Sequence, residues 1–243
     1  MARAVTLLPV GMLDARGSTA TDLARRLAHV RWLAGGTGAG KSTVARILAE
    51  RFGVSSYDGD RAEHDWVSRC TPDRHPRLWA AAGLSREQRS QLTAEDQFTA
   101  MASRHGETIE FLVEDLLALP ADRPVLVDYF GVSPRDLAPL LSWRGQAVFL
   151  LPTPEFRRRA LGIRFADPAR ARANWGDGDH TRALANRLGR DELWDAELRR
   201  QAAAVDLPVL VVDGARDAGA LADDLARRFR LVDGCDGRRR GAS

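Results

Sequence analysis

The sequence predicts an α/β domain built on a five-stranded parallel sheet flanked by helices. Five short apolar runs rich in Val and Leu alternate along the chain with segments of helical periodicity. This alternation is typical of parallel strands with helices packed on both faces. Several of the runs are continuously apolar, as expected for strands buried on both faces. The expected strands span residues 29–34, 54–58, 124–129, 146–151 and 208–213.

Composition excludes several classes of partner. The 243 residues, 44% of them apolar, suffice for one large domain with a sizeable core. The net charge of +3 is small and the charges are interleaved, so no nucleic-acid partner is expected. No apolar run reaches the about 18 residues of a membrane span, and no signal-peptide pattern opens the chain. Cys70 and Cys235 lack metal-ligand spacing. These features predict a cytoplasmic protein with reduced thiols and no membrane partner.

The chain divides into three parts. Residues 1–28 form an N-terminal extension with one expected helix, at 18–28. This helix has two interpretations, packing on the sheet edge or mediating formation of a homodimer. Residues 29–232 form the main domain, and residues 233–243 a tail expected to be disordered.

Helices are expected between the strands. The first begins at Lys41 and stops at Gly53, with an apolar face formed by Val44, Ile47, Leu48 and Phe52. Residues 61–120 are polar and helical, and their last helix is closed by Pro120. Further helical segments follow the remaining strands, at 133–141, 153–161, 162–205 and 220–229.

The stretch GGTGAGKST follows the first expected strand and opens the first helix. It matches G-x-x-x-x-G-K-[ST], in which backbone N–H groups and a helix N-terminus surround an anion. We expect Lys41 to reach the β- and γ-phosphates of a nucleotide, Ser42 to bind Mg²⁺ and Thr43 to contact the α-phosphate. The expected nucleotide-binding residues are Gly35, Gly36, Thr37, Gly38, Ala39, Gly40, Lys41, Ser42 and Thr43.

Lys41 is the only lysine among 36 basic residues. Arginine is larger, planar and forked, and cannot replace a compact point charge inside a phosphate-binding loop. A chain that uses arginine elsewhere therefore keeps lysine where the loop requires it.

The stretch GGTGAGKSTVARILAERFGV, followed by SSYDGD, resembles the small-molecule and nucleoside-monophosphate kinase branch of the P-loop proteins. Gluconate, shikimate and adenylylsulfate kinases and chloramphenicol phosphotransferase belong to this branch. The resemblance covers residues 29–60 closely and the later strands in layout only. It implies a P-loop NTPase fold with acceptor-binding helices in 59–122 and a lid in 153–205. It also implies ATP, Mg²⁺ and transfer of the γ-phosphate to a hydroxyl of a small molecule.

Other P-loop classes fit less well. A Ras-type N-K-x-D motif is excluded because the chain has no second lysine, and no LSGGQ-like signature is present. Instead, Asp58 and Asp60 follow the second expected strand, where the resemblance implies a carboxylate beside the acceptor hydroxyl. Asp60 is the candidate base and acceptor-orienting group. Asp58 would assist Mg²⁺ through water or exchange roles with Asp60. The alternative is a turn and helix cap.

Further candidates follow from strand ends and from the resemblance. Asp128 ends the strand expected beside the phosphate-binding strand, where it would hold Mg²⁺ through water or cap the next loop. The lid implies arginines that neutralise charge on the transferred group. Arg158, Arg164 and Arg172 are favoured there among Arg157, Arg159, Arg170 and other residues that would otherwise be solvated.

The acceptor is expected between residues 59 and 105. His64 follows Asp60 by four residues, so the two share a helix face; the alternative is a capping histidine or one packed on Trp66. Arg61 is a further substrate-binding candidate. Arg74, Arg77 and Arg104 are candidates for an anionic acceptor. Trp66 and Trp79 are expected in the core, and Arg216 beside the adenine.

Three functions remain open from the sequence. The first is an ATP-dependent kinase acting on a small hydroxyl-bearing molecule. The second is a nucleotide-dependent switch or regulatory ATPase with a protein partner. The third, within the enzymes, is a toxin-like nucleotide-sugar kinase or an antibiotic-inactivating kinase.

Overall fold

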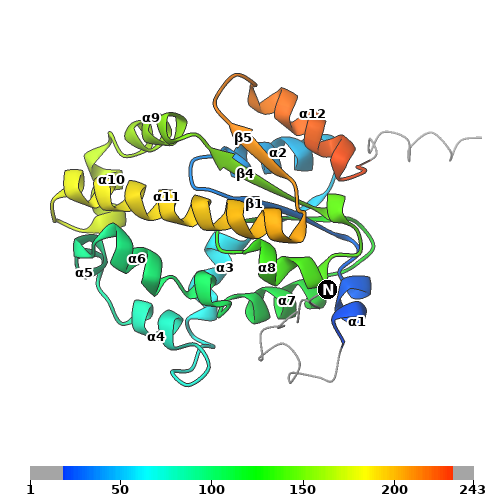
Figure 1. Ribbon diagram of the computed structural model, residues 1–243, viewed down its shortest axis with the longest axis horizontal. Helices are drawn as coiled ribbons and strands as arrows, with labels where there is room; N and C mark the ends of the chain where they lie inside the picture. Colours follow the sequence, from blue (N-terminus) through cyan, green and yellow to red (C-terminus); the bar gives the residue numbers. More distant parts are fainter. Residues whose placement is uncertain (1–18, 232–243) are drawn as a thin grey trace, which may run out of the picture.

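The computed structural model describes residues 19–231 and contains a five-stranded parallel sheet (Figure 1). The strand order is β2-β3-β1-β4-β5. Each strand begins and ends within one residue of its predicted position, so the α/β class and the five parallel strands are confirmed. The predictions for residues 1–18 and 232–243 lie outside the described residues. The strands are β1 (Val30–Gly35), β2 (Ser55–Asp58), β3 (Val125–Tyr129), β4 (Ala147–Pro152) and β5 (Val209–Val212).

Two helices, α2 (Lys41–Phe52) and α12 (Ala218–Arg228), cover one face of the sheet. Successive strand residues point to opposite faces, and Leu33, Leu126 and Val148 meet these helices. Burying such side chains contributes about 1.5–3 kcal/mol each. The helix expected to begin at Lys41 and stop at Gly53 is confirmed, and Gly53 adopts a left-handed conformation there.

The opposite face is covered by a larger set of helices. They are α1 (Ala20–Arg26), α3 (Gly59–Trp66), α7 (Ile109–Ala118), α8 (Pro134–Leu137) and α11 (His180–Val205). Trp32 and Phe149 are fully buried beneath them. The predicted N-terminal helix exists as α1, and its Leu23 packs in this core. It is tied to the domain because Ser142 donates a hydrogen bond to the Ala24 carbonyl.

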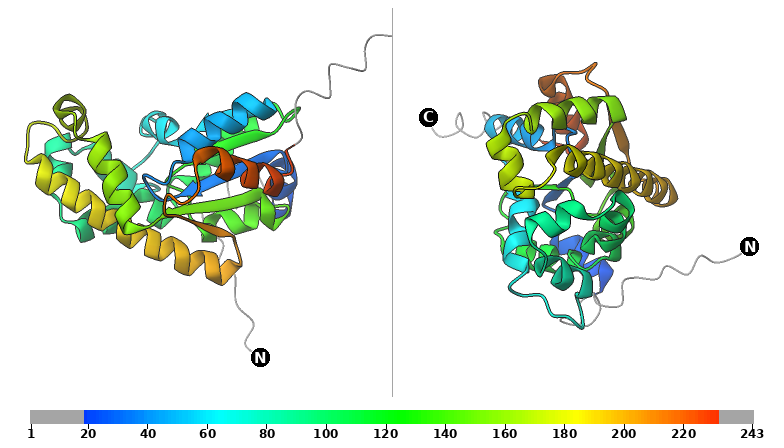
Figure 2. Two further views of the ribbon diagram at one scale, coloured as in Figure 1. Left: turned by 90° about the horizontal axis from the view of Figure 1, so that it is seen from above. Right: turned by 90° about the vertical axis from the view of Figure 1, so that its left-hand side faces the viewer.

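The remaining helices lie beyond the carboxyl ends of the strands, at the left of Figure 1. They are α4 (Pro76–Ala82), α5 (Arg86–Gln91), α6 (Ala94–Ala100), α9 (Pro154–Arg164) and α10 (Pro168–Trp175). Three short 3₁₀ turns complete the described part of the chain, η1 (Ala102–His105), η2 (Ala138–Leu140) and η3 (Arg144–Gln146). Figure 2 shows that α11 runs from this helical end back along the sheet, which joins the two parts.

Within residues 19–231, no helix has both the length and the apolarity to cross a membrane.

Candidate functional site

The glycine-rich loop connects β1 to α2 at the centre of the sheet. In the order β2-β3-β1-β4-β5, β2 and β3 lie on one side of β1, and β4 and β5 lie on the other. The chain therefore reverses its direction across the sheet at β1. Ligands in parallel sheets bind at such a reversal, outside the carboxyl ends of the strands. Helix α2 begins after Gly40 without a side-chain cap, so side chains leave its first N–H groups available to an anion.

Two glycines allow the loop to pack tightly against its neighbours. Gly35 has φ +117°, and a Cβ placed there would lie 2.2 Å from the Leu150 carbonyl oxygen of β4. A Cβ on Gly36 would lie 2.6 Å from Asp195 Oδ1 of α11. The loop is therefore fixed between β4 and α11 before any ligand binds.

Lys41 lies inside this loop with only 7% of its surface exposed. Its ammonium group donates to the carbonyls of Gly35 (3.1 Å) and Gly36 (3.0 Å). Burial lowers the pKa of Lys41, while nearby carboxylates, first Asp128 and then Asp60, act in the opposite direction. The single lysine is thus held at the centre of the loop that the motif predicted.

Asp128 lies at the same edge of the sheet. Its strand β3 pairs with β1 as expected, and Asp128 is opposite Leu33 on one side and Asp58 on the other. Burial raises the pKa of the Asp128 carboxyl, whereas the Lys41 charge and a hydrogen bond from Ser42 lower it.

Ser42 and Asp128 offer oxygen atoms of the kind that Mg²⁺ binds. Within residues 19–231, no three acidic, His or Cys side chains converge closely enough to hold a metal ion by themselves. This is compatible with Mg²⁺, which is usually bound by one or two carboxylates together with water and phosphate oxygens.

The two aspartates after β2 have different positions. Asp58 caps α3 by accepting a hydrogen bond from the Arg61 N–H (3.1 Å), which is the alternative that the sequence left open. Asp60 accepts from the Phe130 N–H (3.3 Å) and lines a cavity, whereas Asp58 does not. Of the two, Asp60 is therefore the one in a position to meet a second ligand.

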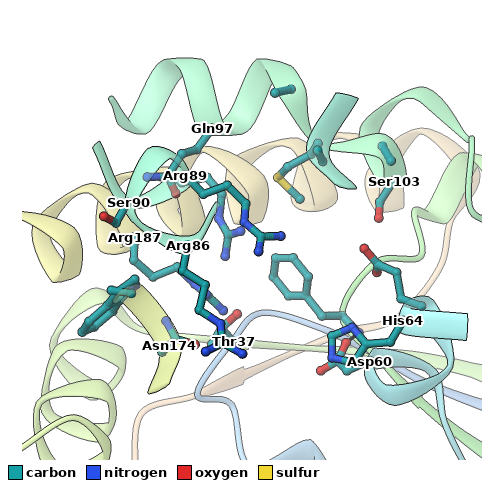
Figure 3. A pocket seen from close by; sticks show the side chains of 18 of the residues that line it. Thr37, Asp60, His64, Arg86, Arg89, Ser90, Gln97, Ser103, Asn174 and Arg187 are labelled. Atoms are coloured by element: carbon teal, nitrogen blue, oxygen red, sulfur yellow. Dashed lines mark hydrogen bonds between the residues drawn. The ribbon is translucent and has the colours of Figure 1, made fainter. Parts of the chain in front are cut away.

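This cavity has a volume of about 770 Å³ and joins the glycine-rich loop to the helical end of the molecule (Figure 3). Its size is in the upper part of the range typical of small-molecule sites. The walls come from the loop, α3, α4, α5, α6, η1, α9, α10 and α11. The polar lining beyond the loop includes Asp60, Glu63, His64, Arg77, Arg86, Arg89, Ser90, Gln97, Ser103, Arg164, Asn174, Arg187 and Arg190.

Helix α3 contributes an acidic face to the cavity. Asp60 and His64 both line it, so the expected shared face is present, and Glu63 lies beside them. The Tyr129 hydroxyl donates to Glu63 Oε2 (2.7 Å). Burial raises the pKa of Glu63 despite this bond. The sequence analysis missed Glu63, although its position three residues after Asp60 placed it on the same face.

The lid candidates fall into distinct positions. Arg164 lines the cavity, whereas Arg158 and Arg172 do not. Arg158 is exposed on α9, and Arg172 is exposed and paired with Asp177 (2.6 Å). The alternative of a solvated side chain is wrong for Arg157, because only 1% of its surface is exposed. Its Nε donates to the Thr37 carbonyl (3.3 Å) and its guanidinium pairs with Asp195, which links α9 and α11 to the loop.

Helix α11 contributes two further arginines that the sequence analysis did not single out. Arg187 (3.2 Å) and Arg190 (2.8 Å) both donate through Nε to the carboxylate of Asp191, which is completely buried. Burial lowers the pKa of Arg190 to about 10. Its guanidinium also lies over the Phe130 ring, 5.1 Å from the centroid. Both arginines are therefore fixed in the cavity wall.

Other candidates lie outside the cavity. Arg61 is exposed, Arg104 covers the Phe98 ring at 4.6 Å, and Arg216 pairs with Asp224 at 3.5 Å near α12. Trp66 is fully buried, as predicted. The prediction that Trp79 lies in the core is wrong: it is 52% exposed, because α4 turns only Leu78 into the core.

Comparisons with known proteins add little to this geometry. No model of a protein family matches the chain, and no curated protein matches it. Among solved structures, an uncharacterized protein from Eubacterium ventriosum ATCC 27560 is 16% identical, with a TM-score of 0.38. The match covers 83% of this chain and 97% of that one. A similarity of this size supports no conclusion on fold family or function.

Proposed function

We propose that this protein is a P-loop phosphotransferase that moves the γ-phosphate of ATP to a hydroxyl of a small molecule, with Mg²⁺. The observation that carries the proposal is a shared cavity. The glycine-rich loop, with the buried Lys41, opens into the same cavity as Asp60 and His64. A donor phosphate on the loop and an acceptor near α3 would therefore meet without intervening protein.

The loop residues would bind the triphosphate. The available N–H groups of the first turn of α2 favour an anion, and Lys41 can transfer its hydrogen bonds from the two loop carbonyls to phosphate oxygens. Ser42 and Asp128 would hold Mg²⁺, which neutralises charge on the β- and γ-phosphates when bound.

Asp60 would accept the proton of the attacking hydroxyl. One carboxylate oxygen is held by the Phe130 N–H, which leaves the other free to meet the acceptor. Arg164, Arg187 and Arg190 face the same space and would stabilise negative charge on the transferred group. The resemblance of residues 29–60 to small-molecule kinases supports these assignments.

The proposal is tested by replacing Asp60 with Asn and measuring ATP binding and phosphate transfer separately. Calorimetry should give a Kd for Mg–ATP within threefold of wild type. ADP release stimulated by an acceptor, found by screening sugars, nucleosides and natural products, should fall at least about 100-fold. Asp65→Asn, an exposed change on the same helix outside the cavity, is the matched control and should keep full activity.

Two outcomes would contradict the proposal. One is near-wild-type transfer by the Asp60→Asn variant. The other is ATP turnover that no acceptor stimulates but a protein partner does, which would identify a nucleotide-dependent switch.

A further inference from the structure

The wall of the cavity contributed by α4 and α5 is strongly basic. Arg77 lies in α4, and Arg86 and Arg89 lie three residues apart on α5, hence on one helix face. Figure 3 shows Arg86 and Arg89 extending into the cavity, across from Asp60 and His64. Within residues 19–231, none of these three arginines forms an ion pair with a carboxylate.

The positive charge of the cavity exceeds what a bound nucleotide requires. The lining contains seven Lys or Arg side chains and two carboxylates, those of Asp60 and Glu63. Arg187 and Arg190 are partly compensated by Asp191 outside the lining. Mg²⁺ neutralises part of the triphosphate charge. The cations on α4 and α5 are therefore left without a counter-charge, and in a concave site their field adds up.

The helices that carry these arginines lie apart from the helix that carries Arg164. Arg164 belongs to α9, which packs on the loop: Ala160 Cβ lies 3.6 Å from where a Cβ on Gly38 would be. Helix α5 instead packs on α10 and α11 at the far end of the cavity. Asn186 of α11 donates there to the Ser90 carbonyl (3.4 Å).

The basic wall is also held in place. Ser85 and Gln88 form a reciprocal capping box at the start of α5, which fixes the helix that carries Arg86 and Arg89. The backbone N–H groups of Arg77 and Leu78 both donate to Glu107 Oε2 (2.9 Å each), which fixes the start of α4. The guanidinium groups therefore project from anchored helices.

We propose that the acceptor carries an oxyanion, a phosphate monoester or a carboxylate, and that Arg86 and Arg89 bind it, with Arg77 beside them. This inference rests on the proposed function, because the oxyanion subsite turns the acceptor hydroxyl toward Asp60 and the loop. Guanidinium forks match both oxyanions, so the test includes one arm for each.

The first experiment measures anion binding with the loop filled. Protein saturated with the Mg²⁺ complex of a non-hydrolysable ATP analogue is titrated with inorganic phosphate and, separately, with acetate. We expect saturable binding of at least one anion, weakened at least tenfold in Arg86→Gln/Arg89→Gln. The matched control, Arg26→Gln/Arg123→Gln, removes two exposed charges outside the cavity and should bind within twofold of wild type. Circular dichroism checks that both variants fold.

The second experiment compares acceptors in pairs, ribose with ribose 5-phosphate and glucose with gluconate, by stimulated ADP release. The anionic member of at least one pair should stimulate ADP release. In the Arg86/Arg89 double variant, the KM for this anionic acceptor should rise at least tenfold, while the KM for ATP stays within twofold of wild type. Three outcomes would each overturn the inference. The neutral member of a pair stimulates ADP release as strongly as the anionic one, the double variant binds the anion as well as wild type does, or the double variant loses ATP binding in place of anion binding. If the ATP analogue does not bind, the proposed function is wrong. The subsite is still tested in that case by titrating the free protein and the Arg86/Arg89 double variant with inorganic phosphate.

Discussion

Lys41→Met should weaken Mg–ATP binding about 150-fold while leaving the stability of the free protein nearly unchanged. Lys41 donates two charged hydrogen bonds to loop carbonyls, worth about 1.5–3 kcal/mol each. Against this, burying an ammonium ion costs several kcal/mol, and burial accordingly lowers the pKa of Lys41. Met has a similar unbranched shape and adapts to the space. The two terms oppose each other, so the free energy of unfolding should change by about 1 kcal/mol or less.

On nucleotide binding, Lys41 would exchange its two carbonyl acceptors for phosphate oxygens, so the gain comes from pairing its buried charge with an anion. Removing one partner of a buried, hydrogen-bonded charge pair costs about 2–5 kcal/mol. A loss of about 3 kcal/mol corresponds to about a 150-fold increase in Kd. ATP at 100 times its Kd stabilises a protein by about 2.7 kcal/mol, or roughly 5–10 °C in Tm for a chain of this size. Thermal unfolding with and without Mg–ATP should show this shift in the wild type and about 1 °C or less in the variant. Calorimetry gives the two Kd values directly.

Arg46→Met is the matched control for Lys41→Met. It removes one positive charge from the same helix, but Arg46 is exposed and pairs with Glu50 at the surface (2.8 Å). Its Kd for Mg–ATP should stay within twofold of wild type. If Lys41→Met binds Mg–ATP within threefold of wild type, the loop does not hold the phosphates. If it unfolds instead, the balance of burial and hydrogen bonding is misjudged.

Two further predictions concern stability and are measured by urea unfolding. Gly35→Ala should lower the free energy of unfolding by more than about 3 kcal/mol, because the added Cβ meets the backbone of β4. Gly40→Ala should lower it by about 1–2 kcal/mol, because Gly40 has φ +79° but no atom within 4 Å of an added Cβ. Equal losses in the two variants would refute this reasoning. Asp115→Ala should cost about 2–4 kcal/mol because Trp66 and Tyr57 lose their acceptor, against less than about 1 kcal/mol for the exposed Glu114→Ala. Burial raises the pKa of Asp115, but hydrogen bonds from Trp66, Arg69 and Tyr57 hold it below 3.8. Its contribution should therefore be complete above pH 3.8 and disappear as the pH falls through the folded-state pKa, a loss that Asp115→Ala should lack.

The sheet and the loop could be predicted because their signals are local. Apolar runs located all five strands to within one residue, and the glycine motif placed Lys41 between strand and helix. The pairing of β3 with β1, which brings Asp128 to the loop, was expected from the resemblance to P-loop proteins and is confirmed. The strands and the glycine motif themselves needed only a short window of sequence.

The arginines of the cavity could not be predicted in the same way. With 36 basic residues in the chain, spacing alone does not separate an arginine that faces a cavity from a solvated one. Arg157 shows the difficulty. Its neighbours Arg158 and Arg159 are exposed, and only the contact with Asp195, 38 residues later, makes it a buried support of the loop.

A different signal in the sequence does point to these contacts, and it lies in the acids rather than the arginines. Asp191 and Asp195 are four residues apart on α11, on the same buried stripe as Trp194 and Leu198. Carboxylates are rarely fully buried unless paired, so two on an apolar stripe predict cationic partners brought from elsewhere. Here they are Arg157, which supports the loop, and Arg187 and Arg190, which line the cavity. One helix face thereby fixes the glycine-rich loop relative to the two cavity arginines of α11, which requires α11 to be rigid between Asp191 and Asp195.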